Sequence, residues 1–430
     1  MTNADATKAS DLIVAAIKGN DLKLRRGALG IVADTKGPRM TRTMVDLLDV
    51  LSTDRKAEMI VALGTRADTK AISSIIAYLK SKDAVIRNAA IRTTGKLGDV
   101  RVVKSLLTAA DSPEFETAVM KAIAGMKGDG IDAVLIESLK YRNLRQTAIR
   151  ACIAHGSTKA VGDLLKLLKD RDADVRKDAW AGLGALADAD DMDSVMKAVV
   201  EIKQAKDLTF AAGAIKGILS RTQDRGKSFQ AVAGHYDAAT ETLKYVILDL
   251  GAVTGDSTAL ELERNALSSR NKELYIRALR ALAKWPNKSA AEDLLTQAQS
   301  ASEMVDRIIA LRGYIRIAGL DSADLSVAER IKMLKTAIGL AQRNIEMKLI
   351  VSALQHAKSL ESLDMLKKYM DDPAIGAEAQ MSAANLTWIL RKEHPAEVAP
   401  IAAQLAKSKN KAVADRAKKT LGKLKQTKAN

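Results

Sequence analysis

The chain has 430 residues, and 68 Lys and Arg against 52 Asp and Glu give it a formal net charge of +16. Hydrophobic residues make up 47% of it, which excludes general disorder and provides enough apolar side chains for a continuous core. Its single cysteine excludes a disulfide framework, a zinc ribbon and a thiolate-held cluster. Because there are only 6 prolines and 3% aromatic residues, we expect a helical protein with an aliphatic core.

No apolar run approaches the roughly 18 residues that a membrane-spanning helix needs. The best stretch, Leu208 to Leu219, is interrupted by Lys216. The first residues carry no basic stretch, and the apolar segment 12–17 is too short for a signal peptide. We therefore expect no membrane span, and the composition fits a cytoplasmic chain and an exported chain alike.

A repeated motif begins near the amino terminus. Segments 21–28, 83–90 and 172–179 all read Asp-x-x-aliphatic-Arg-x-x-Ala. We call the residue at the Arg position the anchor of its unit, and the early anchors follow one another at steps of 28 to 31 residues. Such a fixed period predicts one structural unit repeated along the chain. The first six anchors are Arg25, Lys56, Arg87, Phe115, Arg145 and Arg176.

The series continues at looser steps of 30 to 41 residues, which implies insertions between some units. The final copy, 410–417, resembles the motif clearly again. We therefore expect thirteen units in total. The later anchors are Thr209, Leu243, Tyr275, Arg307, Lys348, Glu378 and Ala414.

Within a unit the apolar residues follow a helical period. They recur at i, i+3, i+4 and i+7 over 161–168, and a second stripe covers 175–186. The polar residues 170–172 between the stripes can cap the second helix, and Gly184 suits a helix end that needs a positive φ. A small residue such as Ala179 allows close approach of neighbouring helices. Each unit is therefore predicted to be two short antiparallel helices that stack on the next pair, with essentially no sheet.

The motif Asp-x-x-Val-Arg-x-x-Ala-x-x-x-Leu-Gly, repeated about every 30 residues, resembles the bacterial HEAT-repeat family and its short units in phycobilin lyases. The resemblance covers 21–184 and the carboxyl end through the motif, and the middle through its spacing. It implies an all-α fold, an armadillo-like α-solenoid superhelix of about thirteen helical hairpins, used mainly for binding. Segments 311–316, 329–334 and 346–351 also resemble HEAT-like modules of certain large exported bacterial proteins.

We divide the expected solenoid into three consecutive parts. Residues 1–200 hold the regular repeats with a basic face, 201–345 hold divergent repeats, and 346–430 hold terminal repeats with a Lys-rich capping helix. The excess charge lies at the two ends. Residues 1–150 carry 25 basic and 17 acidic side chains, and residues 407–430 carry nine basic groups and one acidic group.

Basic residues one or five places after an anchor are i, i+4 neighbours on one helix face. In HEAT-like solenoids the second helix lines the concave side, so these residues are candidates for a partner-binding surface. The same residues could equally form a merely solvated face. The candidates are Arg26, Arg92, Arg150, Lys177, Arg280 and Arg312.

The anchors and the carboxyl end have structural interpretations of their own. Anchor arginines commonly pair with acidic loop residues such as Asp83 and Asp172, which would form a ladder between units. The Lys-rich end is interpreted as the polar outer face that a last repeat needs, in preference to a nucleic-acid-binding tail.

The sequence offers no catalytic constellation. Cys152 and His155 lie three residues apart, but Cys152 occupies a position that other units fill with an apolar residue, so we interpret it as core. The acidic loop 188–193 lacks the glycine and glutamate that an EF-hand needs. No zinc or phosphate-binding motif appears, and Trp180, Trp285 and Trp388 are interpreted as core.

The sequence therefore predicts a non-enzymatic scaffold that binds another protein, with no cofactor and no metal, and we expect it to be a monomer. The alternative is a solenoid that binds nucleic acid by contacting phosphates through its basic amino-terminal face.

Overall fold

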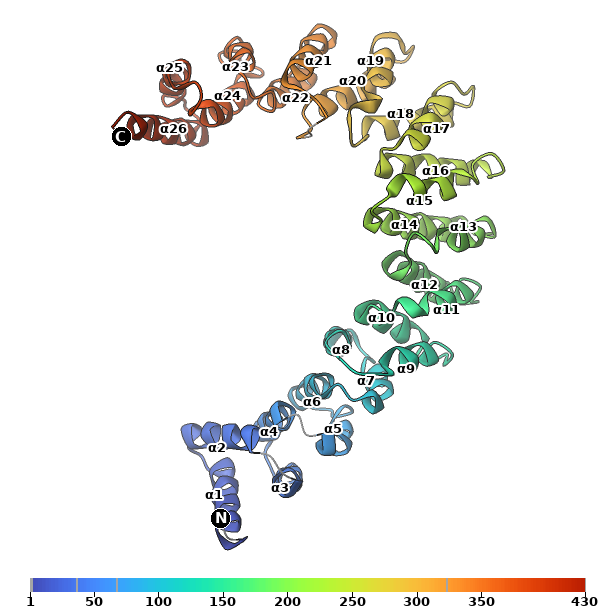
Figure 1. Ribbon diagram of the computed structural model, residues 1–430, viewed down its shortest axis with the longest axis vertical. Coiled ribbons are helices and arrows are strands. Elements are labelled where there is room, and N and C mark those ends of the chain that lie inside the picture. The colour runs from blue at the N-terminus through green and yellow to red at the C-terminus, as the bar shows by residue number, and fades with distance from the viewer. Residues whose placement is uncertain (1–2, 36–37, 67–68, 322–323, 430) are drawn as a thin grey trace. The chain divides into compact units, whose positions relative to one another are not determined.

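The computed structural model describes residues 3–35, 38–66, 69–321 and 324–429, and within these ranges it contains 26 α-helices, four 3-10 helices and no strand (Figure 1). The helices alternate as first and second members of thirteen consecutive pairs. The predicted all-α solenoid of thirteen hairpins is therefore confirmed.

The first helices are mostly short, and four of them begin with a 3-10 turn. They are α1 (Asn3–Lys18), α3 (Pro38–Leu47), α5 (Ile72–Tyr78), α7 (Val103–Ala109), α9 (Ile131–Ser138), α11 (Val161–Leu167), α13 (Met192–Val200), α15 (Arg225–Ala233), α17 (Ser257–Leu267), α19 (Ala291–Ser300), α21 (Val327–Leu340), α23 (Leu360–Lys367) and α25 (Pro395–Leu405). The 3-10 turns are η1 (Thr69–Ala71), η2 (Val100–Val102), η3 (Thr158–Ala160) and η4 (Lys288–Ala290).

The second helices carry the anchors: all thirteen predicted anchors lie in them, including those for which the motif itself is lost. They are α2 (Leu22–Asp34), α4 (Thr53–Arg66), α6 (Ala84–Leu97), α8 (Pro113–Ala124), α10 (Arg145–His155), α12 (Ala173–Leu186), α14 (Ala205–Arg221), α16 (Glu241–Thr254), α18 (Lys272–Ala283), α20 (Met304–Ala318), α22 (Asn344–Leu354), α24 (Gly376–Leu390) and α26 (Lys411–Ala429).

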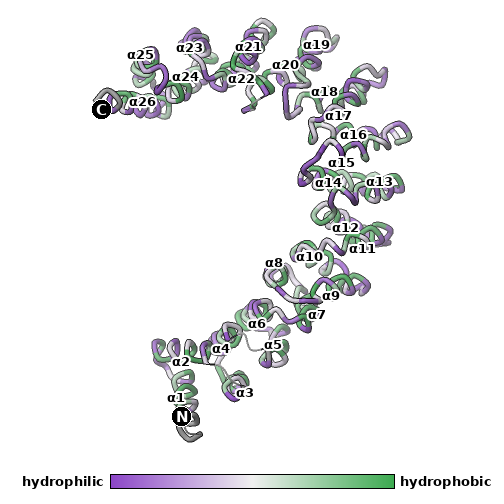
Figure 2. Tube along the Cα trace, viewed as in Figure 1, coloured by the Kyte–Doolittle hydropathy of each residue, from purple (hydrophilic) through white to green (hydrophobic). Residues whose placement is uncertain are grey.

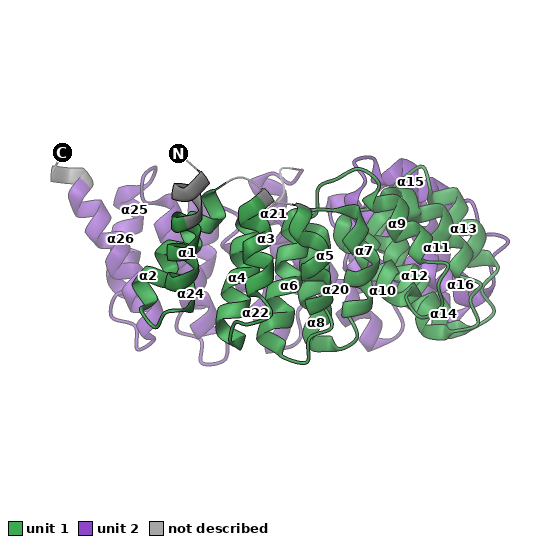
Figure 3. Ribbon diagram, turned by 90° about the horizontal axis from the view of Figure 1, so that it is seen from below, with its two compact units in different colours: residues 1–218 green, residues 219–430 purple. Residues whose placement is uncertain are grey.

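The chain divides into two compact units, residues 1–218 and 219–430, which are coloured separately in Figure 3. In the first unit each second helix from α2 to α12 contacts the next, and the same holds from α16 to α26 in the second unit. Within each unit the second helices form one layer and the first helices form the other (Figure 1). The three-part division expected from the sequence stays a prediction.

Aspartates begin several second helices. The Asp21 and Asp83 carboxylates each accept hydrogen bonds from two backbone N–H groups of the following turn, at 2.7 to 3.2 Å. Asp172 accepts one from Asp174 N at 2.9 Å. The predicted capping by the polar segment 170–172 is confirmed, because these carboxylates satisfy N–H groups that have no partner inside the helix.

Small residues set the spacing between consecutive second helices. Ala90 and Ala179, at the centre of the motif, are completely buried. At Gly95 an added Cβ would lie 2.6 Å from Ala122 Cβ. The expectation that Gly184 ends its helix is wrong: it lies inside α12, where an added Cβ would meet Ala214 Cα at 2.9 Å. Its role is close packing, whereas Gly98, with φ +67°, does end α6.

The ends of several second helices are completed by the following repeat. Arg66 Nη1 donates to the Val32 carbonyl in the last turn of α2 at 3.1 Å. His155 Nδ1 lies 3.1 Å from the Ile123 carbonyl of α8, and in the second unit Arg316 Nε donates to the Ala283 carbonyl of α18 at 2.8 Å. Positive or polar groups at a helix carboxyl end satisfy its orphan carbonyls and complement its dipole.

The core is aliphatic, as the composition predicts, and Figure 2 shows hydrophobic and hydrophilic residues interleaved along the helices. Trp180 and Trp285 are buried, but Trp388 is only half-buried, so its assignment to the core is wrong. The Arg391 guanidinium lies 3.7 Å from the centre of its ring, and Lys419 and Arg416 of α26 lie further away, at 5.0 and 5.2 Å. None of the helices in the described ranges is long and apolar enough to cross a bilayer.

Candidate partner-binding face

The six basic residues predicted to bind a partner all lie on second helices, and all six are exposed. Four belong to the first unit and two, Arg280 and Arg312, to the second. We call the exposed side of the second helices within one unit its second-helix face. The geometry of the face divides the six residues into two groups.

Arg150 joins three consecutive repeats of the first unit. From α10 its Nη1 donates to Glu116 of α8 at 2.5 Å, and its Nη2 donates to Asp178 of α12 at 3.0 Å. The hydrogen bond to Glu116 is the largest cause of the raised pKa of Arg150. This side chain is therefore partly occupied in holding the face together, although it is 42% exposed.

Arg312 has a comparable partner in the second unit. Its Nη2 lies 2.8 Å from Glu346 of α22, a carboxylate that also accepts two hydrogen bonds from Arg343. The Arg343 hydrogen bond lowers the pKa of Glu346, and burial opposes that effect. Glu346 is only 1% exposed, so this ionised carboxylate depends on its two arginines.

The other four candidates, Arg26, Arg92, Lys177 and Arg280, make no hydrogen bond or ion pair with any described residue. An apolar side chain occupies the equivalent place on α4. Val61, five residues after its anchor Lys56, is 45% exposed. The second-helix face of the first unit thus combines uncompensated basic groups with exposed apolar surface.

The anchors form the predicted ladder between repeats, but with other acidic partners than expected. Arg87 donates to Asp111 at 2.6 Å, and Arg145 pairs with Asp170 at 2.5 Å. Arg176, which is 7% exposed, pairs with Asp207 of α14 at 2.7 Å. Asp83 and Asp172 cannot fill this role because they cap helices, so the expected pairing with them is wrong.

The thiol and imidazole of α10 do not form a reactive pair. Cys152 is fully buried, and burial raises the pKa of its thiol to about 12, so the sulfur stays protonated. His155 is instead hydrogen-bonded to the end of α8. Across the described ranges, no group of three or more His, Cys, Asp or Glu side chains is placed to hold a metal ion.

Three pockets form where the turn inside one repeat meets the turn inside the next. One of about 600 Å³ lies between the turns before α12 and α14, one of about 250 Å³ between those before α20 and α22, and one of about 540 Å³ between those before α24 and α26. A fourth lies between α23 and α25. Sequence patterns could not predict them, since each pocket combines residues about 30 to 45 positions apart.

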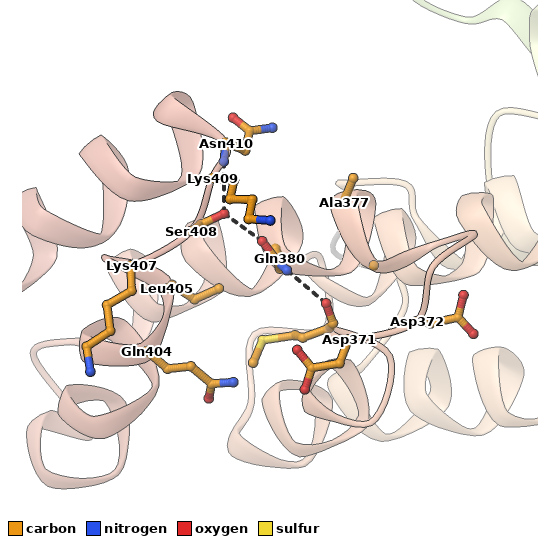
Figure 4. A pocket seen from close by; sticks show the side chains of 12 residues that line it. Asp371, Asp372, Ala377, Gln380, Gln404, Leu405, Lys407, Ser408, Lys409 and Asn410 are labelled. Carbon is orange, nitrogen blue, oxygen red and sulfur yellow. Dashed lines mark hydrogen bonds between the residues drawn. The ribbon is translucent and has the colours of Figure 1, made fainter.

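Figure 4 shows the pocket between α24 and α26, where Gln380 lies at the centre. Gln380 Nε2 donates to the Met370 carbonyl at 2.8 Å, and Gln380 Oε1 accepts from Ser408 Oγ at 2.7 Å. The central amide is thus held by protein groups. The charged residues of this pocket, Asp371 and Asp372 against Lys407 and Lys409, balance.

The family model for HEAT repeats matches residues 44–127 and 133–212, both within the first unit. The chain is a HEAT-repeat protein. The helical pairs beyond residue 212 continue the same arrangement without matching that family model. No curated protein sequence matches the chain.

Solved structures with a similar fold differ widely in sequence. Kap121p bound to Nup53p is 14% identical, with a TM-score of 0.50 over 98% of this chain and 49% of that one. The CpcE–CpcF complex of phycocyanin lyase from Nostoc sp. PCC7120 is 18% identical over 56% and 94%, and human deoxyhypusine hydroxylase 16% over 66% and 97%, each with a TM-score of 0.26. The chain spans about half the length of the Kap121p structures it matches.

Proposed function

We propose that this HEAT-repeat protein is a non-enzymatic scaffold that binds a protein partner through the second-helix face of its first unit. The supporting observation is the composition of that face. Arg92 and Lys177 are exposed with no hydrogen bond or ion pair to any described residue, and Val61 is 45% exposed on the helix between α2 and α6. Arginine and apolar side chains together are typical of protein interfaces.

The rigidity of the face also supports this function. Arg150 links α8, α10 and α12, and the anchors link further repeats. A surface whose side chains are already positioned loses less conformational freedom on binding. Kap121p, which has a similar fold, has been solved with Nup53p bound.

Charge reversal at the two unpaired residues tests the proposal. Arg92→Glu combined with Lys177→Glu should weaken the complex with the main co-purifying protein at least tenfold, because both groups would now repel an acidic partner surface. Titration of the purified partner, followed by calorimetry, measures this. The matched control reverses two exposed lysines on the first-helix side, Lys159→Glu with Lys197→Glu, and should bind like the parent. Equal loss in both variants would reject this face.

Nucleic-acid binding is the second candidate, because three uncompensated basic residues, Arg26, Arg92 and Lys177, lie in the unit with the amino-terminal charge excess. If eight basic groups neutralised phosphates, the plot of log affinity against log salt would have a slope of about −7. Anisotropy of a labelled DNA duplex between 50 and about 200 mM salt measures that slope. Absence of duplex binding at the lowest salt would eliminate this candidate.

A further inference from the structure

The pocket of about 250 Å³ in the second unit lies between the first turn of α20 and the turn that leads into α22. Met304 and Arg307 line it from α20, and Arg343 and Glu346 line it from the start of α22. Nothing in the HEAT-repeat architecture requires two arginines here. Their charge distinguishes this pocket from the others.

The other two turn pockets are electrically balanced. The pocket before α12 and α14 has three basic and three acidic lining residues, and the one before α24 and α26 has two of each. The pocket between α23 and α25 has one lysine and two acids. The pocket before α20 and α22 has two arginines and one glutamate, so among these four it alone has an excess of positive charge.

The single glutamate is not available to Arg307. Glu346 is 1% exposed and accepts hydrogen bonds at 2.6 to 2.9 Å from Arg343 and from Arg312. Arg307 is exposed and makes no hydrogen bond or ion pair through its guanidinium to any described residue. Glu303, four residues before it, does not line the pocket.

The contrast with the corresponding anchor of the first unit shows what Arg307 lacks. Arg176 lines the pocket before α12 and α14, where its guanidinium bonds to Asp207 and to Gln204 of the next repeat. In the next repeat after Arg307 the corresponding turn supplies Gln342 and Arg343. A second arginine therefore lies where the first unit places a carboxylate.

Exposed apolar side chains surround this positive pocket. Met304 and Val305 at the start of α20 are 49% and 64% exposed, and Ile345 and Leu349 on α22 are 56% and 41% exposed. Four large apolar groups so close on two neighbouring helices favour a partner that covers them. A free phosphate ion would leave them in water.

We propose that this pocket receives an aspartate or glutamate side chain of a protein partner, from a segment whose neighbouring residues are apolar. The carboxylate supplies the acceptor that Arg307 lacks, in the bidentate geometry that guanidinium groups prefer. The flanking apolar residues cover Met304, Val305 and Ile345. This assignment rests on the proposed scaffold function and adds a second contact region, in the second unit.

The test uses the full chain and a panel of labelled nine-residue peptides with one central glutamate or aspartate between leucine, isoleucine, methionine or phenylalanine residues. Each peptide has a partner with glutamine or asparagine at the centre. Fluorescence anisotropy should show at least one acidic peptide binding at least tenfold more tightly than its amide counterpart. Arg307→Gln should abolish that difference without changing the melting temperature, because Arg307 supports no other described group.

Arg270→Gln is the matched control, since Arg270 is also exposed in the second unit, outside the pocket, without a hydrogen bond or ion pair to a described residue. It should bind the peptides like the parent. The proposal is overturned if no acidic peptide exceeds its amide counterpart, if Arg307→Gln binds like the parent, or if inorganic phosphate binds Arg307-dependently while the peptides do not. Loss of partner binding on reversing Arg92 and Lys177 is independent of these outcomes, so the two proposals fail separately.

Discussion

At the scale of single residues, the most unusual group is Glu263 on α17. It is fully buried, and neither carboxylate oxygen has a hydrogen-bond partner in the described part of the chain. Burial, with a smaller contribution from the charge of Asp249, raises its pKa to about 10. An isolated buried carboxylate is too costly to leave ionised, so the folded protein keeps this group protonated at neutral pH.

The pH dependence of stability follows from that shift. In the unfolded chain Glu263 releases its proton near the ordinary glutamate pKa of 4.5, whereas the folded chain holds it until about pH 10. The stabilisation is therefore complete below pH 4.5 and is lost progressively as the pH rises towards 10. Glu263→Gln, which cannot ionise, should remove this slope. Melting temperatures from about pH 5 to 9 should fall more steeply for the parent than for the variant; parallel curves would contradict a buried neutral carboxyl.

The residues that sequence reasoning identified and missed differ in one respect. Exposure of Arg92 or Lys177 follows from helix periodicity, which is local. The acid that pairs with an anchor lies 24 to 31 residues away in a neighbouring turn or helix, as with Arg87 and Asp111 or Arg176 and Asp207. Which carboxylate reaches it depends on the neighbour's turn, and the positive pocket at Arg307 and Arg343 could not be found without coordinates for the same reason.

At the scale of elements, consecutive second helices are held close by residues with little or no side chain. The period of the motif predicted all thirteen of these helices because the length of a stacked pair is nearly constant. It could not tell a glycine that ends a helix from one that packs inside it. Gly98 and Gly184 follow leucine in the same motif, yet Gly98 ends α6 and Gly184 packs on Ala214.

Adding a single methyl group tests this close packing. Gly95→Ala should destabilise the fold by about 1–3 kcal/mol, because its Cβ would lie 2.6 Å from Ala122 Cβ and 2.8 Å from Ala122 Cα. The same change at Gly213, an exposed position inside α14 with nothing within 4 Å, should stabilise by about 0.5–1 kcal/mol. Thermal unfolding followed by circular dichroism measures both; equal effects would show that α6 and α8 can move apart.

At the scale of the whole molecule, two compact units of stacked pairs imply that stability is mainly a matter between neighbours. The pairs contact adjacent pairs, and the ion pairs that link repeats mostly join residues 24 to 34 positions apart. A stack with such contacts unfolds locally, with a free energy set by each repeat and its interfaces.

Amide hydrogen exchange should therefore reveal where a perturbation ends. In Gly95→Ala, exchange should accelerate in α4, α6 and α8, next to the strained contact, and remain at the parent rate in α22, α24 and α26. Mass spectrometry of peptides from both units resolves the two regions. A uniform acceleration over all thirteen pairs would instead show that the chain unfolds as one cooperative body.

The bonds from Arg66, His155 and Arg316 to the preceding second helix give the stack a direction. Each donor belongs to the later repeat, and each carbonyl belongs to the earlier one. Shortening the protein from its carboxyl end removes the donor above the repeat that becomes terminal and leaves its carbonyls bare. Shortening it from the amino end frees only a long polar side chain, which water can solvate. Losses from the two ends are thus unequal, and a repeat appended at the carboxyl end brings with it the donor that the previous last repeat lacked.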